Sequence, residues 1–204
     1  MTSLRNLIRE LIKEEAELKY PIPSSDIDNA ISRAFEILGF TSTDMDNDFQ
    51  ENSTLATLRV FMKRIAVTES GGNNRGLPDQ FTHHKRNPFQ LDDASINTVK
   101  NNVNMKRWRK EIDSLTAKDP RKPYNQPTSS QNRDEIIKSN NLSALFATLY
   151  VLWRAKVWNP ASIHNVKFDE ILGTTPDAQA KFWKKWYNTP AGDGKKSDFI
   201  DKNS

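Results

Sequence analysis

The sequence LATLRVFMKRIAVTESGG, residues 55–72, decides how the rest of the chain is interpreted. Its apolar side chains recur at intervals of three and four residues, which predicts a helix from Leu55 to Ser70 with one buried face. That face is formed by Leu58, Phe61, Met62 and Ile65. Glu69 lies four residues beyond Ile65 and therefore extends the same apolar face.

Glu69 is the unusual member of this face, because burying a carboxylate is costly. Gly71 and Gly72 predict that the helix ends directly after it, so its carboxyl group would lie beside uncapped backbone carbonyls. Partial burial and the negative end of the helix dipole both favour the protonated form. The protonated form is the one that a general acid needs. The alternative is that Glu69 is a solvated residue in the last turn of an ordinary helix.

Three short motifs follow one another along the chain: ESGG at residues 69–72, PFQL at 88–91 and WYN at 186–188. In this order they resemble the motifs of the lysozyme-like lytic transglycosylases and goose-type lysozymes. In that superfamily a Glu-Ser pair ends a buried helix, a Gly-Leu-Met-Gln-like segment follows a loop, and an Ala-Tyr-Asn-like segment lies on a late helix. Here the middle motif keeps only the Gln, and Trp186 replaces a common Ala. The resemblance covers residues 50–204.

The resemblance implies a mainly α, lysozyme-like helical domain that cleaves the MurNAc-GlcNAc β-1,4 glycosidic bond of peptidoglycan. In it Glu69 would be the catalytic acid. The substrate-binding residues would be Ser70, Gln90, Tyr187 and Asn188, and the Tyr187 hydroxyl would reach the Glu69 carboxyl group. Glycan strands of peptidoglycan are the expected partner, with no cofactor and no metal.

The reaction could proceed with one carboxylate or with two. Two-carboxylate glycosidases need a second acidic group at a set distance from the first. None stands in a clear motif, which favours a lytic transglycosylase, in which the single acid then acts as a base on the muramyl 6-hydroxyl. Asp79 and Asp92 are the candidate second carboxylates if the enzyme is a muramidase that hydrolyses the same bond. A further alternative is a non-catalytic virion protein that retains the fold.

Composition limits the remaining possibilities. The 204 residues are 36% hydrophobic and 27% charged, which is typical of a globular protein. The absence of cysteine excludes disulfides and thiolate chemistry. A net charge of +4 suits an anionic partner such as peptidoglycan with its peptide carboxylates. His83 and His84 are adjacent, so on a helix or strand they cannot face one metal together.

The N-terminus does not read as a signal peptide, because charges interrupt residues 1–20 every two or three positions. The longest apolar run, near residues 144–153, is too short to span a bilayer. A wall-degrading enzyme would then need another route to its substrate. A bacteriophage product fits, carried in the virion with other virion proteins, or released at lysis from the host cytoplasm to the periplasm and cell wall.

Residues 1–50 are expected to form an N-terminal helical pair that packs on the catalytic domain, residues 51–204. The first helix spans 3–19, and the second begins at a Ser24 or Ser25 cap. The buried side of the second comprises Ile27, Ala30, Ile31, Ala34, Ile37 and Leu38. The alternative is that the pair is a separate docking hairpin.

The connector after these helices contains Asp44, Asp46 and Asp48, which alternate like the first ligands of an EF-hand loop. The match fails at the sixth and twelfth positions, which are Phe49 and Leu55. A polar connector without bound calcium is therefore expected.

A helix is also predicted over residues 92–110, with Ile96, Val99, Val103 and Trp108 facing inward. Four cations surround this tryptophan: Lys106, Arg107, Arg109 and Lys110. Such a patch can bind nucleic acid through phosphate contacts and stacking. A solvated helix end with one anchored tryptophan is commoner, so nucleic acid is not the expected partner.

The C-terminal half begins with a proline-containing surface excursion over residues 115–133. The central core helix is predicted over 134–158, ending at Asn159-Pro160. A last helix is expected to begin at a Thr175 cap with proline at its first position. The tail from Ala191 is expected to be loosely held.

Overall fold

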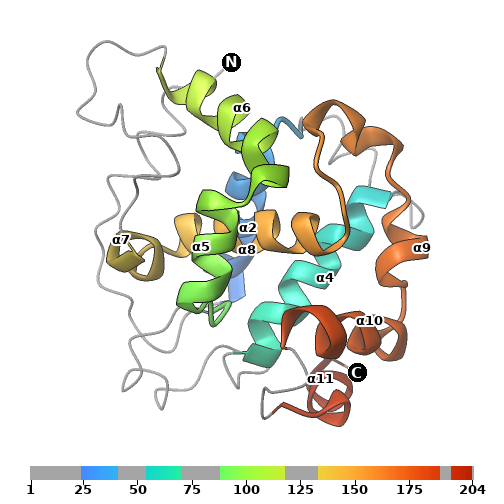
Figure 1. The fold of residues 1–204 in the computed structure, drawn as a ribbon. Coiled ribbons are helices and arrows are strands. Elements are labelled where there is room, and N and C mark those ends of the chain that lie inside the picture. The colour runs from blue at the N-terminus through green and yellow to red at the C-terminus, as the bar shows by residue number, and fades with distance from the viewer. Residues whose placement is uncertain (1–23, 41–53, 70–87, 118–132, 189–193, 204) are drawn as a thin grey trace.

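The computed structural model describes residues 24–40, 54–69, 88–117, 133–188 and 194–203, and every regular element in these ranges is helical (Figure 1). The α-helices are α2 (Ser24–Ile37), α4 (Thr54–Glu69), α5 (Asp93–Asn101), α6 (Lys106–Ala117), α7 (Arg133–Lys138), α8 (Asn140–Arg154), α9 (Phe168–Leu172), α10 (Pro176–Phe182) and α11 (Lys196–Asn203). Short 3-10 turns η3 (Val103–Met105) and η5 (Pro160–Asn165) and a π-helical segment η6 (Trp183–Tyr187) complete them. The expected mainly α class is confirmed. None of the helices in these ranges has the length and hydropathy needed to cross a bilayer.

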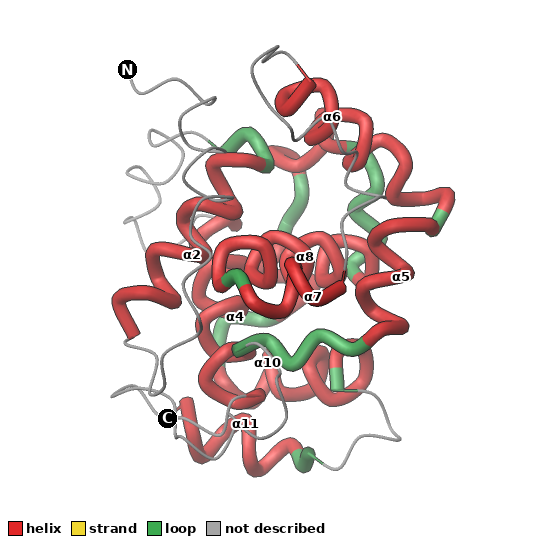
Figure 2. The backbone as a smooth tube through the Cα atoms, turned by 90° about the vertical axis from the view of Figure 1, so that its left-hand side faces the viewer, coloured by secondary structure: helices red, strands yellow, loops and turns green. Residues whose placement is uncertain are grey.

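Helix α8 is the centre of the fold. Every side chain from Asn141 to Leu152 is buried, as in a helix that neighbours surround on all sides. Helices α2, α4, α5 and α7 and segment η6 all pack against it, and Figures 1 and 2 show it crossing the middle of the molecule. The predicted core helix is thus confirmed, but it is shorter. Ser139 separates α7 from α8 by accepting a hydrogen bond from the Leu142 N–H at 3.2 Å, and α8 ends at Arg154 rather than at Asn159-Pro160.

Helix α4 buries the face that its sequence predicts. Leu58, Phe61, Met62 and Ile65 are all fully buried, and the helix ends at Glu69. It contacts α2, α8, α9 and α11, so elements from early and late parts of the chain pack against it.

Helix α2 also matches its predicted buried side, because all six expected residues are at most 5% exposed. Gly39 ends the helix with a φ of +86°, a left-handed conformation that glycine adopts without strain. Its side chains join the same hydrophobic core as those of α4 and α8. The predicted helix over 3–19 and the connector with Asp44, Asp46 and Asp48 lie outside the described residues.

The helix predicted over residues 92–110 is in fact α5, η3 and α6. The chain leaves helical geometry at Asn102, whose ψ is 133° and whose side chain accepts a hydrogen bond from the Asn104 N–H at 2.9 Å. This break resets the helical phase. Val103, predicted to face inward, is therefore 76% exposed, and Met105 is buried instead. Trp108 is buried as predicted, and its indole N–H donates to the Val157 carbonyl at 2.9 Å.

The expectation of a loosely held C-terminal tail is wrong for residues 194–203. They include α11, whose Phe199 is fully buried. The Phe199 ring lies 6.2 Å from that of Phe61 on α4 and 5.4 Å from that of Trp183 on η6. A buried aromatic side chain contributes enough apolar contact to hold a short helix in place.

Two glycines allow a test of how tightly the helices pack. Gly173, between α9 and α10, has a φ of +80°, and a Cβ there would lie 2.3 Å from the Ala178 Cβ. Gly39 has a similar φ, but a Cβ there would meet nothing within 4 Å. Gly39→Ala is expected to lower the free energy of unfolding by about 1 kcal/mol, from backbone strain alone. Gly173→Ala is expected to lower it by about 2–4 kcal/mol, because a steric clash is added. Urea unfolding measures both, and equal losses would contradict the packing described here.

Candidate active site

Segment η6 contacts residues from two distant parts of the chain, Glu69 at the end of α4 and Phe89 before α5. The Trp183 Nε1–H donates a hydrogen bond to Glu69 Oε1 at 2.7 Å. The Tyr187 hydroxyl donates to the Phe89 carbonyl oxygen at 2.7 Å. Segment η6 therefore binds the last residue of α4 through one side chain and the segment before α5 through another.

Glu69 is partly exposed, although it ends a helix whose preceding turn is buried. Helix α11 holds this end of α4. The Lys202 ammonium group donates to the Thr68 carbonyl at 3.1 Å, and the Asn203 amide donates to the Thr68 hydroxyl at 2.9 Å. A cation beside the last carbonyls of a helix is favourable for the helix dipole. These two residues were not identified from the sequence, because only the docking of α11 brings them to Thr68.

Trp183 is a partner that helps to orient the Glu69 carboxyl group. Its side chain is 1% exposed and packs against Phe199. Gly194 lies so close that a Cβ there would be 2.7 Å from the Trp183 Cη2 atom. Since the indole is enclosed, the direction of its N–H is set by packing. The sequence alone did not identify Trp183 as a site residue, because local spacing does not indicate which N–H meets the acid.

The π-helical geometry of η6 separates the roles of its residues. The Asn188 N–H donates to the Trp183 carbonyl at 2.8 Å, five residues back, so this turn contains one residue more than an α-helical turn. The wider turn changes the relative directions of Trp183 and Tyr187. One side chain reaches Glu69 and the other reaches Phe89. Such π-helical turns are frequent at functional sites.

Tyr187 is partly exposed, and its hydroxyl hydrogen goes to Phe89 rather than to Glu69, which differs from the geometry that the resemblance implied. Loss of solvent around the phenol group raises the pKa of Tyr187 well above its usual value. Electrostatic interactions with Glu69, Tyr150 and Asp92 raise this pKa further. The phenol is therefore a neutral donor throughout the physiological pH range.

Gln90 combines two features that cost free energy. Its φ is +50°, a left-handed conformation that is uncommon for residues other than glycine. Its side-chain Nε2 is buried and has no hydrogen-bond partner in the described structure. An unsatisfied buried donor of this kind costs about 1–3 kcal/mol. The neighbours Phe89 and Leu91 are buried and hold the segment in this geometry.

The other expected site residues are less central. Asn188 accepts a hydrogen bond from the Lys184 ammonium group at 3.0 Å at the end of η6. Asp92 is exposed and caps α5 by accepting from the Ser95 N–H at 2.7 Å. Ser70 and Asp79 lie outside the described residues, as do the two adjacent histidines at 83 and 84. Within the described ranges, no group of three or more His, Cys, Asp or Glu residues could hold a metal ion.

An aromatic and cationic cluster on α8 adjoins Tyr187 and was also missed from the sequence. The Tyr150 ring lies 5.8 Å from that of Tyr187, edge to face, and stacks on that of Trp153. The Arg154 guanidinium lies 4.5 Å from the centre of the Trp153 ring and donates to the Tyr150 hydroxyl at 3.0 Å. The spacing of these three residues on one helical face was the available signal. The cluster gives the site a positively charged side.

Comparison with known proteins assigns no family. No model of a known protein family matches the chain, and neither curated proteins nor solved structures give a significant match. The chemistry of this site is therefore inferred from the contacts described above.

Tyr187→Phe removes the phenol group but keeps the ring, which tests the environment of Tyr187. The unfolded chain ionises this residue near pH 10.0, whereas the folded chain ionises it only at a much higher pH. In the wild type, the unfolded state alone therefore loses this proton above about pH 10, and the free energy of unfolding falls as pH rises further. The variant is expected to be about 1 kcal/mol less stable at neutral pH, because the hydrogen bond to Phe89 is lost. Above pH 10, its free energy of unfolding is expected to fall less steeply than that of the wild type, because it has no phenol to ionise.

Urea unfolding of both proteins, at neutral pH and above pH 10, makes the comparison. If the two free energies of unfolding fell in parallel above pH 10, the Tyr187 phenol would not be in the environment described.

Proposed function

We propose that this protein cleaves the β-1,4 glycosidic bond between MurNAc and GlcNAc in peptidoglycan, as a lytic transglycosylase with Glu69 as its catalytic acid. One observation carries the proposal. Glu69 is partly exposed at the end of a buried helix, and the enclosed Trp183 indole donates to its carboxyl group at 2.7 Å. The segment of this donor also contacts the PFQL motif, because Tyr187 donates to the Phe89 carbonyl at 2.7 Å.

The chemistry begins with a proton for the leaving glycosidic oxygen, which a carboxylic acid supplies. After Glu69 gives up its proton, the Trp183 N–H stabilises the carboxylate, because a hydrogen bond to the charged form favours that form. Since the indole is already oriented by packing, little reorganisation accompanies this step. The carboxylate then acts as a base on the muramyl 6-hydroxyl, which attacks the anomeric carbon and closes a 1,6-anhydro ring.

A single acid is favoured over a pair. Within the described residues, the candidate for a second carboxylate is Asp92, which is exposed. Its side chain accepts a hydrogen bond from the Ser95 N–H, in the role of a helix cap. A muramidase that uses Asp92 or Asp79 as a base remains the alternative, and the products distinguish the two reactions.

Substrate positioning is assigned to the residues around the acid. The buried Gln90 amide, which has no partner in the described structure, would be satisfied by a sugar hydroxyl or an N-acetyl oxygen. Tyr187 holds the Gln90 segment through Phe89. Arg154, stacked over Trp153, is a suitable donor for the carboxylates of the muramyl group or its peptide.

Digestion of purified peptidoglycan followed by mass analysis of the products tests the reaction. Anhydromuramyl ends indicate a lytic transglycosylase, and reducing ends indicate a muramidase. Glu69→Gln keeps an oxygen that can accept from Trp183 but cannot donate an acid proton, so cleavage is expected to fall by at least about 100-fold. Glu170→Gln is the matched control, because Glu170 is exposed on α9 and pairs with Lys167 at 2.7 Å.

Undiminished cleavage by Glu69→Gln would refute the assignment of Glu69 as the catalytic acid. A wild-type protein that is folded but cleaves no peptidoglycan would indicate a binding protein.

Asp92→Asn separates the two reactions by a second route. Asparagine caps helices as well as aspartate does, so the fold should be kept. A transglycosylase that relies on Glu69 is expected to keep most of its rate of cleavage in this variant. A fall of about 100-fold, measured in the same digestion with unchanged helix content, would instead identify Asp92 as a catalytic base.

A further inference from the structure

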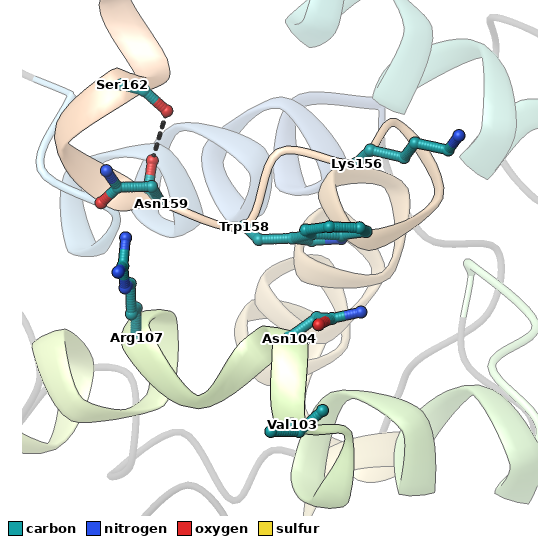
Figure 3. Close-up of a pocket in the computed structure, with 7 residues that line it drawn as sticks. All are labelled: Val103, Asn104, Arg107, Lys156, Trp158, Asn159 and Ser162. Atoms are coloured by element: carbon teal, nitrogen blue, oxygen red, sulfur yellow. Dashed lines mark hydrogen bonds between the residues drawn. The ribbon is translucent and has the colours of Figure 1, made fainter.

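A pocket of about 410 Å³ lies between the start of α6 and the segment that follows α8 (Figure 3). It is lined by Val103, Asn104, Arg107, Lys156, Trp158, Asn159 and Ser162. None of these residues belongs to the candidate active site. The volume lies within the range of small-molecule sites.

Trp158 forms the flat part of this pocket. Its side chain is 39% exposed, and its indole N–H donates to the Trp153 carbonyl at 3.4 Å. The preceding residue, Val157, is buried and accepts the hydrogen bond from the Trp108 indole. The backbone below the exposed ring is therefore anchored. Figure 3 shows the indole edge-on, with Arg107 to one side of it and the Lys156 side chain extending away on the other.

Two cations from different elements belong to the same pocket. Arg107 comes from the first turn of α6 and Lys156 from the turn after α8, and both are exposed. In the described part of the chain, neither side chain forms an ion pair or a hydrogen bond, and no carboxylate lines the pocket. Figure 3 shows Arg107 pointing toward Asn159 across the pocket. The local charge therefore favours an anionic ligand.

We propose that this pocket binds a nucleotide unit, with its base stacked on Trp158 and its phosphate held by Arg107, while Lys156 on the other side of the ring adds to the positive charge. An aromatic platform beside a positively charged groove is the combination by which proteins bind single-stranded nucleic acid. Two cations without carboxylate partners favour a phosphate group over a neutral sugar. The nucleotide comes either from a strand or from the free pool, and both share this chemistry.

This site differs from the basic patch that the sequence indicated. Trp108, at the centre of that patch, is fully buried and cannot stack on a base. Arg109 donates to the backbone carbonyls of Val99 and Asn102, both at 2.9 Å. Only the three-dimensional arrangement brings the exposed Trp158 beside Arg107.

Binding of the full-length protein to a fluorescent oligothymidylate and to thymidine monophosphate tests the proposal. Affinity is expected to weaken with salt, and Trp158→Ala is expected to weaken it about tenfold or more, while Trp158→Phe keeps most of it. Arg107→Ala and Lys156→Ala should each weaken binding to the strand and reduce the slope of log affinity against log salt by about 0.7.

Two controls separate the pocket from general charge and from the proposed enzymatic site. Lys181→Ala removes the same charge from α10, where Lys181 pairs with Asp177 at 3.0 Å, and should leave binding unchanged. Glu69→Gln should also leave it unchanged, so this proposal can hold even if the protein cuts no peptidoglycan. Stronger binding of the strand than of the monophosphate identifies the strand as the source, and the reverse identifies a free nucleotide.

Failure of both nucleotide probes to bind at low salt would overturn the proposal, as would equal affinity in the wild type and Trp158→Ala. Purified, uncleaved glycan strands are the third probe. If they bound more tightly than the oligothymidylate, and Trp158→Ala abolished that binding, the pocket would be a carbohydrate site instead.

Discussion

The hydrogen bond from the Trp183 indole to the Glu69 carboxyl group joins residues 114 positions apart, and the candidate active site depends on it. It requires that α4 end at Glu69 and that η6 present its indole at that end. The second condition rests on the aromatic contacts among Phe61, Phe199 and Trp183. The acid is therefore oriented by the packing of the core and not by a flexible side chain alone.

Two unfavourable features lie in the segments that meet at the candidate site, the segment of Gln90 and η6. Gln90 has a left-handed backbone and an unsatisfied buried amide, and η6 contains a π-helical turn. Such features persist only where the surrounding structure compensates for them. The compensation comes from α8, which is buried along most of its length, and from α11, which holds the end of α4. A rigid scaffold with local strain is the arrangement expected of a preorganised site.

The two proposed sites use aromatic residues in opposite ways. Trp183 is enclosed, so its N–H serves as a directed donor, whereas Trp158 is exposed, so its ring face is available to a ligand. The sites also lie at different ends of the helical body, since Figure 1 shows α10 and α11 at the bottom and α6 at the top. Exposure, rather than residue type, therefore decides what each tryptophan can do.

The sequence by itself determined the helices and the faces that they bury. Leu58, Phe61, Met62 and Ile65 are buried as their spacing predicts, and Thr175 caps α10, with proline at the first position, as its local pattern predicts. These features depend on residues within one or two helical turns of each other. The breaks at Asn102 and Ser139 also involve local bonds, to the Asn104 and Leu142 N–H groups, which the apolar periodicity did not reveal. The docking of α11, the partner of Glu69 and the exposure of Trp158 were decided only by the tertiary structure. They depend on contacts between residues far apart in the chain, whose free energy no local periodicity records.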